Sequence, residues 1–182
     1  MAHNICVYCS SSNAASQGLF EAAEDLGRLM AERGFGLIYG GASVGLMGSL
    51  ARSVQSAGGK VVGVIPEGLK ERELAYEKAD ELIVTPDMRT RKARMEERSD
   101  GFIALPGGFG TLEEVLEIMT LRQLGYHNKP IVFVNAQGFY SELMAFFDRI
   151  YEEYLARETE HKLYYVADTP EQALDFLSEA MG

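Results

Sequence analysis

The sequence has little that would suit a membrane span, a disulfide-stabilised fold or a polyanionic partner. Its 182 residues include two cysteines and no tryptophan, and the longest apolar runs, at 60–66 and 130–135, are strand-sized, whereas a bilayer span needs roughly 20 residues. The first residues do not resemble a secretory signal, so we expect a cytoplasmic protein without a membrane segment. The formal charge of −10 would repel a nucleic acid, so a nucleic acid is a poor first candidate for a partner.

The few potential metal ligands are not arranged as a metal site. Cys6 and Cys9 form a C-x-x-C pair, which admits a redox pair or half of a zinc site. They lie in an apolar run without a second ligand pair, so we interpret them as small buried hydrophobic residues. The histidines His3, His127 and His161 have no ligand spacing. We therefore expect surface histidines and no metal.

What the sequence does contain is a regular alternation of short β-branched runs and longer amphipathic segments. Strands are predicted at 4–9, 36–39, 61–65, 81–84, 102–105, 131–134 and 163–166, and helices at 16–33, 45–57, 88–99, 112–124, 140–154 and 170–180. Strands joined by right-handed crossover helices run parallel and carry helices on both faces. The sequence thus predicts one α/β domain over 1–182, a three-layer, Rossmann-like, doubly wound parallel sheet of about seven strands.

The helix predicted at 112–124 has apolar residues on two sides. One stripe consists of Leu112, Val115, Leu116 and Met119, and a second contains Ile118 and Leu121. One side would face the sheet, and the other most simply packs against a second subunit. We therefore predict a homodimer.

Three loops that follow predicted strands consist of small residues and lead into helices, at 10–13, 40–45 and 106–111. In open parallel sheets, ligands bind outside the carboxyl ends of the strands. The N–H groups of such loops, together with the positive end of the following helix, suit a phosphate. Each loop taken singly is also explained by the glycine that a tight turn requires. None is a G-x-G-x-x-G or Walker A motif, so neither a dinucleotide nor a nucleoside triphosphate is indicated.

A cationic segment precedes the third loop in this acidic protein and contains Arg89, Arg91, Lys92, Arg94 and Arg98. One interpretation is a solvated helix face whose cations pair with neighbouring glutamates. Its place directly before the glycine-rich strand and loop favours the other interpretation, an anion site.

Thr111 and Glu114 also have two interpretations. The T-x-x-E pattern at a helix start is a capping box, in which the carboxylate returns to a backbone N–H group. A carboxylate on the first turn beside a phosphate loop is equally well placed for chemistry on a ribose. The two roles do not exclude each other.

Several stretches together form a specific pattern. They are P-G-G-x-G-T-x-x-E at 106–114, M-x-x-R-K-A at 88–93, C-S-S-S at 9–12, Y-G-G at 39–41 with G-L-M-G at 45–48, and Q-L-G-Y-H-N-K-P at 123–130. By this pattern almost the whole chain resembles the LONELY GUY family of cytokinin riboside 5′-monophosphate phosphoribohydrolases, long misannotated as lysine decarboxylases. Ala42 departs from it, since many relatives have a third glycine there, which weakens the case for close ligand contact by that loop.

The resemblance implies an enzyme that hydrolyses the N-glycosidic bond of adenosine 5′-monophosphates, N6-modified or plain, without a cofactor. It implies Arg91 and Glu114 as the catalytic pair. The loops and the resemblance together give as substrate-binding residues Ser10, Ser11, Gly41, Glu73, Met88, Lys92, Gly107, Gly108, Phe109, Gly110, Thr111, Leu112, Glu113 and Thr120. The competing interpretation is a nonenzymatic carrier or sensor that binds the nucleotide uncleaved. A decarboxylase would need pyridoxal phosphate on a lysine, for which the sequence has no motif.

Overall fold

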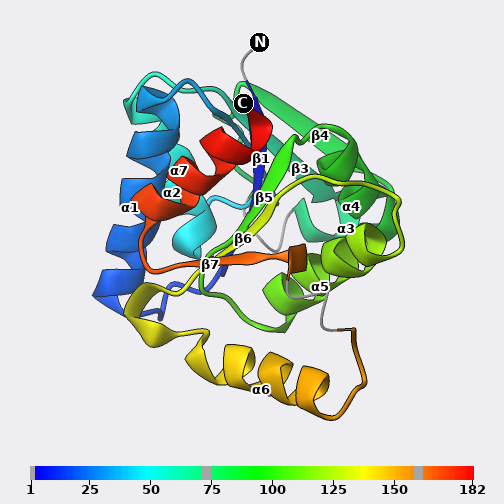
Figure 1. Ribbon diagram of the computed structural model, residues 1–182. Coiled ribbons are helices and arrows are strands. Elements are labelled where there is room, and N and C mark those ends of the chain that lie inside the picture. Colours follow the sequence, from blue (N-terminus) through cyan, green and yellow to red (C-terminus); the bar gives the residue numbers. More distant parts are fainter. Residues whose placement is uncertain (1–2, 71–74, 158–161) are drawn as a thin grey trace.

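A computed structural model describes residues 3–70, 75–157 and 162–182, and its strands form one seven-stranded sheet (Figure 1). The strands are β1 (Asn4–Tyr8), β2 (Gly36–Tyr39), β3 (Val61–Pro66), β4 (Glu81–Thr85), β5 (Gly101–Ala104), β6 (Ile131–Val134) and β7 (Tyr165–Ala167). Every neighbouring pair is parallel. The predicted α/β class and parallel sheet are confirmed.

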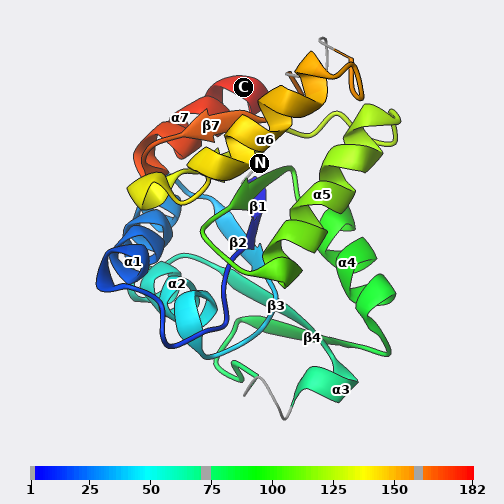
Figure 2. The ribbon, with the colours of Figure 1, turned by 90° about the horizontal axis from the view of Figure 1, so that it is seen from below.

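Helices cover both faces of this sheet (Figures 1 and 2). One face packs against α1 (Gln17–Glu32), α2 (Gly45–Ser56) and α7 (Pro170–Met181), and the other against α4 (Met88–Glu97), α5 (Phe109–Gln123) and α6 (Ser141–Glu152). Two short helices, α3 (Glu67–Lys70) and the 3-10 helix η1 (Ala136–Gly138), were not predicted from the sequence. No helix in the described ranges is long and apolar enough to span a bilayer. The three-layer, doubly wound arrangement is confirmed.

The strand order is β4-β3-β2-β1-β5-β6-β7, so the direction of strand addition changes at β1. The chain adds β2, β3 and β4 outward on one side of β1, then returns to pair β5 with its other side. Ligands of open α/β sheets bind at such a switch point, outside the carboxyl ends of the strands. The loops after β1 and β5 therefore flank the expected ligand crevice.

The starts of β7 and α5 differ from the predicted ones. β7 begins at Tyr165 rather than at residue 163, and the Leu163 carbonyl accepts a hydrogen bond from Arg122 Nη1 at 2.9 Å outside the sheet. α5 begins at Phe109, with Gly108 as its N-cap, three residues before the predicted start at 112. This second difference changes the geometry of the site described below.

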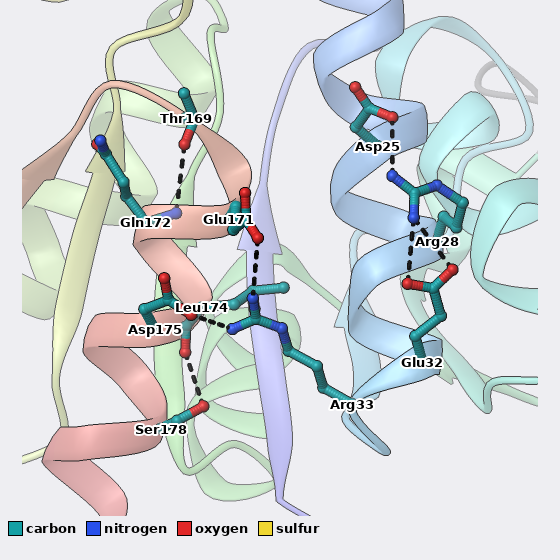
Figure 3. Close-up of polar contacts among 10 residues, drawn as sticks. All are labelled: Asp25, Arg28, Glu32, Arg33, Thr169, Glu171, Gln172, Leu174, Asp175 and Ser178. Atoms are coloured by element: carbon teal, nitrogen blue, oxygen red, sulfur yellow. Dashed lines mark hydrogen bonds and ion pairs between the residues drawn. The ribbon is translucent and has the colours of Figure 1, made fainter.

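Polar contacts join the end of α1 to α7 at the surface (Figure 3). Arg33 Nη1 lies 2.6 Å from Asp175 Oδ1, and Arg33 Nη2 lies 3.9 Å from Glu171 Oε1. Exposed ion pairs of this kind contribute only about 0–1 kcal/mol each. The position of α7 therefore follows chiefly from its buried face, which includes Leu174 and Leu177.

Cys6 and Cys9 are buried, free thiols in two different cores. Residues three apart along an extended chain point to opposite sides of a sheet. Cys6 accordingly packs in the core under α4, α5 and α6, whereas Cys9 packs in the core under α1 and α2. Their interpretation as small buried hydrophobic residues is confirmed.

We expect neither thiol to react with a chromogenic disulfide reagent at mildly alkaline pH while the protein is folded. Burial raises the pKa of both Cys6 and Cys9 well above the ordinary thiol range, so the reactive thiolate is scarce. Titration should detect both thiols only after unfolding in guanidinium chloride. Two rapidly reacting thiols in the native protein would contradict this account of the strand.

Candidate active site

A cavity of about 320 Å³ lies at the switch point of the sheet. Its walls come from the loops after β1 and β5, with contributions from α2, α3, α4 and the first turns of α5. The lining residues are Cys9, Ser10, Ser11, Ser12, Met47, Leu69, Met88, Arg91, Gly108, Gly110, Thr111, Glu113 and Glu114. Both members of the predicted catalytic pair therefore face one cavity.

Arg91 is fixed in this cavity by main-chain carbonyls. Its side chain is almost fully buried, with 4% of the residue exposed. Nε donates to the Val64 carbonyl of β3 at 3.1 Å, and Nη2 donates to the Gly40 carbonyl directly after β2 at 3.4 Å. Nη1 lies 3.6 Å from Glu114 Oε1. These two main-chain carbonyls thus orient the guanidinium plane toward the carboxylate.

Glu114 lies on α5 and is buried to a similar degree, with 5% exposed. Because Gly108 is the N-cap, Thr111 is already the third residue of the helix and cannot cap it. The capping-box interpretation is therefore wrong. The glycine-rich loop lets the helix start early, and this places Glu114 beyond the first turn, facing Arg91 and the cavity.

Arg91 and Glu114 form a buried ion pair, and removing one partner leaves the other charge desolvated. The neighbouring titratable groups at the end of β1 and directly after it are Tyr8 and Cys9. Burial, with smaller contributions from Cys6 and Glu114, raises the pKa of Tyr8 well above its ordinary value. Burial likewise raises the pKa of Cys9, with the Glu114 charge as the next cause. Tyr8 and Cys9 therefore add no charge beside the pair.

The start of α5 is suited to an anion. The first N–H groups of any α-helix have no intrahelical acceptor, and Gly108, Gly110 and Thr111 line the cavity at this end. A Cβ on Gly107 would lie 2.1 Å from Thr111 Oγ1, so a glycine is required for the tight turn under the Thr111 side chain. Phe109 is 93% exposed and does not line the cavity. Three residues of the predicted phosphate loop therefore line the cavity, and phosphate binding by this loop stays a prediction.

The loop after β2 has a different role from the one predicted. The Gly45 N–H donates to Asn13 Oδ1 at 2.8 Å, and the Met47 N–H donates to the Ser10 carbonyl at 3.2 Å. Gly45 has φ +60, and a Cβ there would lie 2.3 Å from the Ser11 main chain. The first amides of α2 therefore hold the serine loop in place, and Gly41 is not among the cavity-lining residues.

The predicted cationic cluster is divided by the structure. Lys92 Nζ lies 2.5 Å from Glu113 Oε1 and 2.8 Å from Glu117 Oε2, so it joins α4 to α5 outside the cavity lining. Arg94 and Arg98 form surface ion pairs with Glu97 and Glu81, as the solvated-face interpretation requires. Of the cationic residues that the structure describes, Arg91 is the only one that lines the cavity.

Some predicted residues lie elsewhere. Leu112 is partly buried and packs against the core under α4, α5 and α6. Thr120 donates its hydroxyl to the Leu116 carbonyl and lines a second, apolar groove between α5 and α6. Glu73 and His161 lie outside the described residues.

The expectation of surface histidines is wrong for His127. This side chain is half-buried, its Nε2 lies 3.0 Å from the Ile118 carbonyl, and its ring lies 5.6 Å from that of Phe102. The loop after α5 folds back against the helix, which its polar sequence did not reveal.

Several residues of the site were not predicted from the sequence. Gly40 supplies a carbonyl to Arg91, and Met47, Leu69, Cys9 and Ser12 line the cavity. Gly40 and Met47 lie in the Y-G-G and G-L-M-G stretches, which were a usable signal. Leu69 follows a strand without any distinguishing pattern.

Comparison with known proteins gives consistent matches over most of the chain. The family model described as "Possible lysine decarboxylase" matches residues 47–177. A cytokinin riboside 5′-monophosphate phosphoribohydrolase of Arabidopsis thaliana is 43% identical over 175 residues, which cover 96% of this chain and 81% of that protein. A probable enzyme of the same name from Oryza sativa subsp. japonica is 42% identical over 175 residues, covering 96% and 72%.

Solved structures share the fold at lower identity. The molybdenum cofactor binding protein from Rippkaea orientalis has a TM-score of 0.77 and 24% identity, covering 100% of this chain and 99% of that one. The molybdenum cofactor carrier protein of Chlamydomonas reinhardtii has a TM-score of 0.75 and 22% identity, covering 98% and 97%. At these identities the likeness shows the fold alone.

Proposed function

The chain belongs to the LONELY GUY family of cytokinin riboside 5′-monophosphate phosphoribohydrolases, and we propose that it hydrolyses the N-glycosidic bond of adenosine 5′-monophosphates, plain or N6-modified. The products are the free base and ribose 5-phosphate. The observation that carries the proposal is the buried Arg91–Glu114 pair, which shares one cavity with the glycine-rich start of α5.

The substrate is oriented by its phosphate. The 5′-phosphate accepts hydrogen bonds from the first amides of α5, where the helix dipole adds favourable charge. Ser10 and Ser11 also line the cavity and offer hydroxyl groups. Glu114 lies about one helical turn, or ~5.4 Å, along the axis from this first turn. The ribose therefore spans the distance between the phosphate and the carboxylate.

The base contacts the apolar side chains that line the cavity. Met47, Leu69 and Met88 come from three different helices and meet at the same cavity. Thioether side chains adapt their shape to flat or irregular ligands. This wall suits a purine ring and tolerates an apolar N6 substituent.

The chemistry follows from the charge that develops in the ribose. As the C1′–N9 bond breaks, its electron pair goes to the base and positive charge builds on the ring. The Glu114 carboxylate stabilises that charge and takes a proton from the attacking water, whose oxygen forms the new bond to C1′. The leaving base takes up one proton, which balances the proton that Glu114 removes from the water. Arg91 orients the carboxylate through the ion pair between Nη1 and Glu114 Oε1.

Incubation of the purified protein with AMP tests the reaction, with adenine and ribose 5-phosphate separated by chromatography. We expect both products in equal amounts, and much slower release from adenosine, which lacks the phosphate. A parallel incubation with isopentenyladenosine monophosphate compares plain and modified bases. Tight binding of AMP without adenine release would instead identify a nonenzymatic carrier.

The proposed assembly is a homodimer through the outer side of α5. Val115 and Ile118 face the sheet together, so the two stripes predicted from the sequence are not separated as expected. Leu116 is 38% exposed and borders the apolar groove of about 170 Å³ between α5 and α6. A second copy supplies the matching apolar surface in an isologous contact.

Light scattering on a size-exclusion column should give about twice the monomer mass of 20.1 kDa. Leu116→Asp should shift the protein toward the monomer, because it places a charge in the contact. Val84→Asp is the matched control, since Val84 is 40% exposed on the edge strand β4. A wild-type monomer would contradict the dimer.

A further inference from the structure

We propose that Gly40 is a positioning residue for the Arg91–Glu114 pair. The missing side chain at residue 40 gives the guanidinium the space in which it reaches the Val64 and Gly40 carbonyls and the Glu114 carboxylate. This inference rests on the proposed function, because the pair is assigned there to the hydrolysis of the N-glycosidic bond.

The contact between Gly40 and Arg91 leaves no room for a methyl group. A Cβ built on Gly40 would lie 2.1 Å from Arg91 Nη2, 3.3 Å from Arg91 Cζ and 3.2 Å from Met47 Sδ. Real Cβ contacts are essentially never shorter than 3.0 Å. Any side chain at residue 40 therefore displaces the guanidinium.

Backbone conformation does not explain this glycine. The neighbouring Gly41 has φ +78, a left-handed conformation that favours glycine. Gly40 is not among the described glycines with a positive φ, so an alanine fits its backbone without strain. The tight-turn explanation applies to Gly41, and a different cause, the close approach of Arg91, applies to Gly40.

The clash would be relieved by movement of the Arg91 guanidinium and not by movement of the sheet. β2 is held between β1 and β3 by parallel pairing on both sides, whereas Nη2 ends a flexible side chain. The guanidinium is enclosed, with Nη1 3.6 Å from Met88 Sδ and 3.6 Å from Glu114 Oε1. Displacement from Gly40 therefore breaks the Nη2 contact and changes the approach to Glu114.

Gly40→Ala should lower kcat for AMP hydrolysis about 10- to 100-fold, since an error of about 1 Å in a catalytic group has effects of this size. KM should change little, because the phosphate is held by α5. Gly68→Ala is the matched control, since a Cβ on Gly68 of α3 meets nothing within 4 Å. A Gly40→Ala enzyme with the wild-type kcat would overturn the inference. An inactive wild type would instead overturn the proposed function.

A double-mutant cycle separates positioning from a general structural role. In an Arg91→Ala protein the obstructing guanidinium is absent, so adding Gly40→Ala should cause less than about a twofold further loss of kcat. Gly40→Ala should also lower the melting temperature less in the Arg91→Ala protein than in the wild type. Equal losses in both backgrounds would overturn the inference. If Gly40→Ala alone does not fold while Arg91→Ala does, the double variant should fold as the Arg91→Ala protein does, and an unfolded double variant would then equally overturn the inference.

Discussion

Replacing Glu114 with glutamine should lower kcat for adenine release from AMP at least about a hundredfold, which is the lower range of acid–base contributions. Glutamine has almost the same shape, but its amide neither accepts a proton from water nor stabilises positive charge at C1′. The protein should remain folded, which circular dichroism would verify. The chromatographic adenine assay measures the effect.

Glu117→Gln is the matched control for this substitution. Glu117 lies on the same helix about one turn beyond Glu114, contacts Lys92 and does not line the cavity. Its replacement should leave kcat within about twofold of the wild type, as expected of an exposed ion pair. Near wild-type turnover in the Glu114→Gln enzyme would remove Glu114 from the mechanism.

Arg91→Lys should lower kcat/KM about 10- to 100-fold although the charge is kept, because misplacement by about 1 Å has effects of that size. The guanidinium donates in one plane from Nε to Val64 and from Nη2 to Gly40 while Nη1 faces Glu114. A single ammonium group cannot reproduce three fixed directions. Steady-state kinetics with AMP measure the change.

The control for this second substitution is Arg94→Lys on the same helix. Arg94 is exposed and pairs with Glu97 across one turn of α4, so a lysine preserves most of its interaction. Its kinetics should match those of the wild type. Equal losses for Arg91→Lys and Arg94→Lys would show that charge on α4 matters and the planar geometry does not.

The sequence predicted the layers of this fold well, because hydrophobic periodicity is a local property. Each of the seven predicted strands is present within a few residues of its expected place. Strand order is not local, and periodicity does not reveal that β5 pairs with β1. The loop after β2 was therefore grouped with the phosphate loops, although it lies off the switch point and supports the serine loop.

Within the site, the motifs identified the reactive side chains but not the main-chain contacts that fix their positions. Arg91 and Glu114 were predicted to act together, and the structure places them 3.6 Å apart. The Gly40 carbonyl that fixes Arg91 lies 51 residues away along the chain, a contact that no spacing indicates. The capping-box interpretation failed because T-x-x-E resembles a helix start, while the glycine-rich backbone lets α5 begin earlier.

A crystal structure of the Glu114→Gln enzyme with AMP tests the central claim most directly. The account predicts the 5′-phosphate on the amides at the start of α5, beside Gly108, Gly110 and Thr111, with C1′ facing residue 114. A nucleotide bound in another cavity, or a phosphate directed away from that helix, would contradict it.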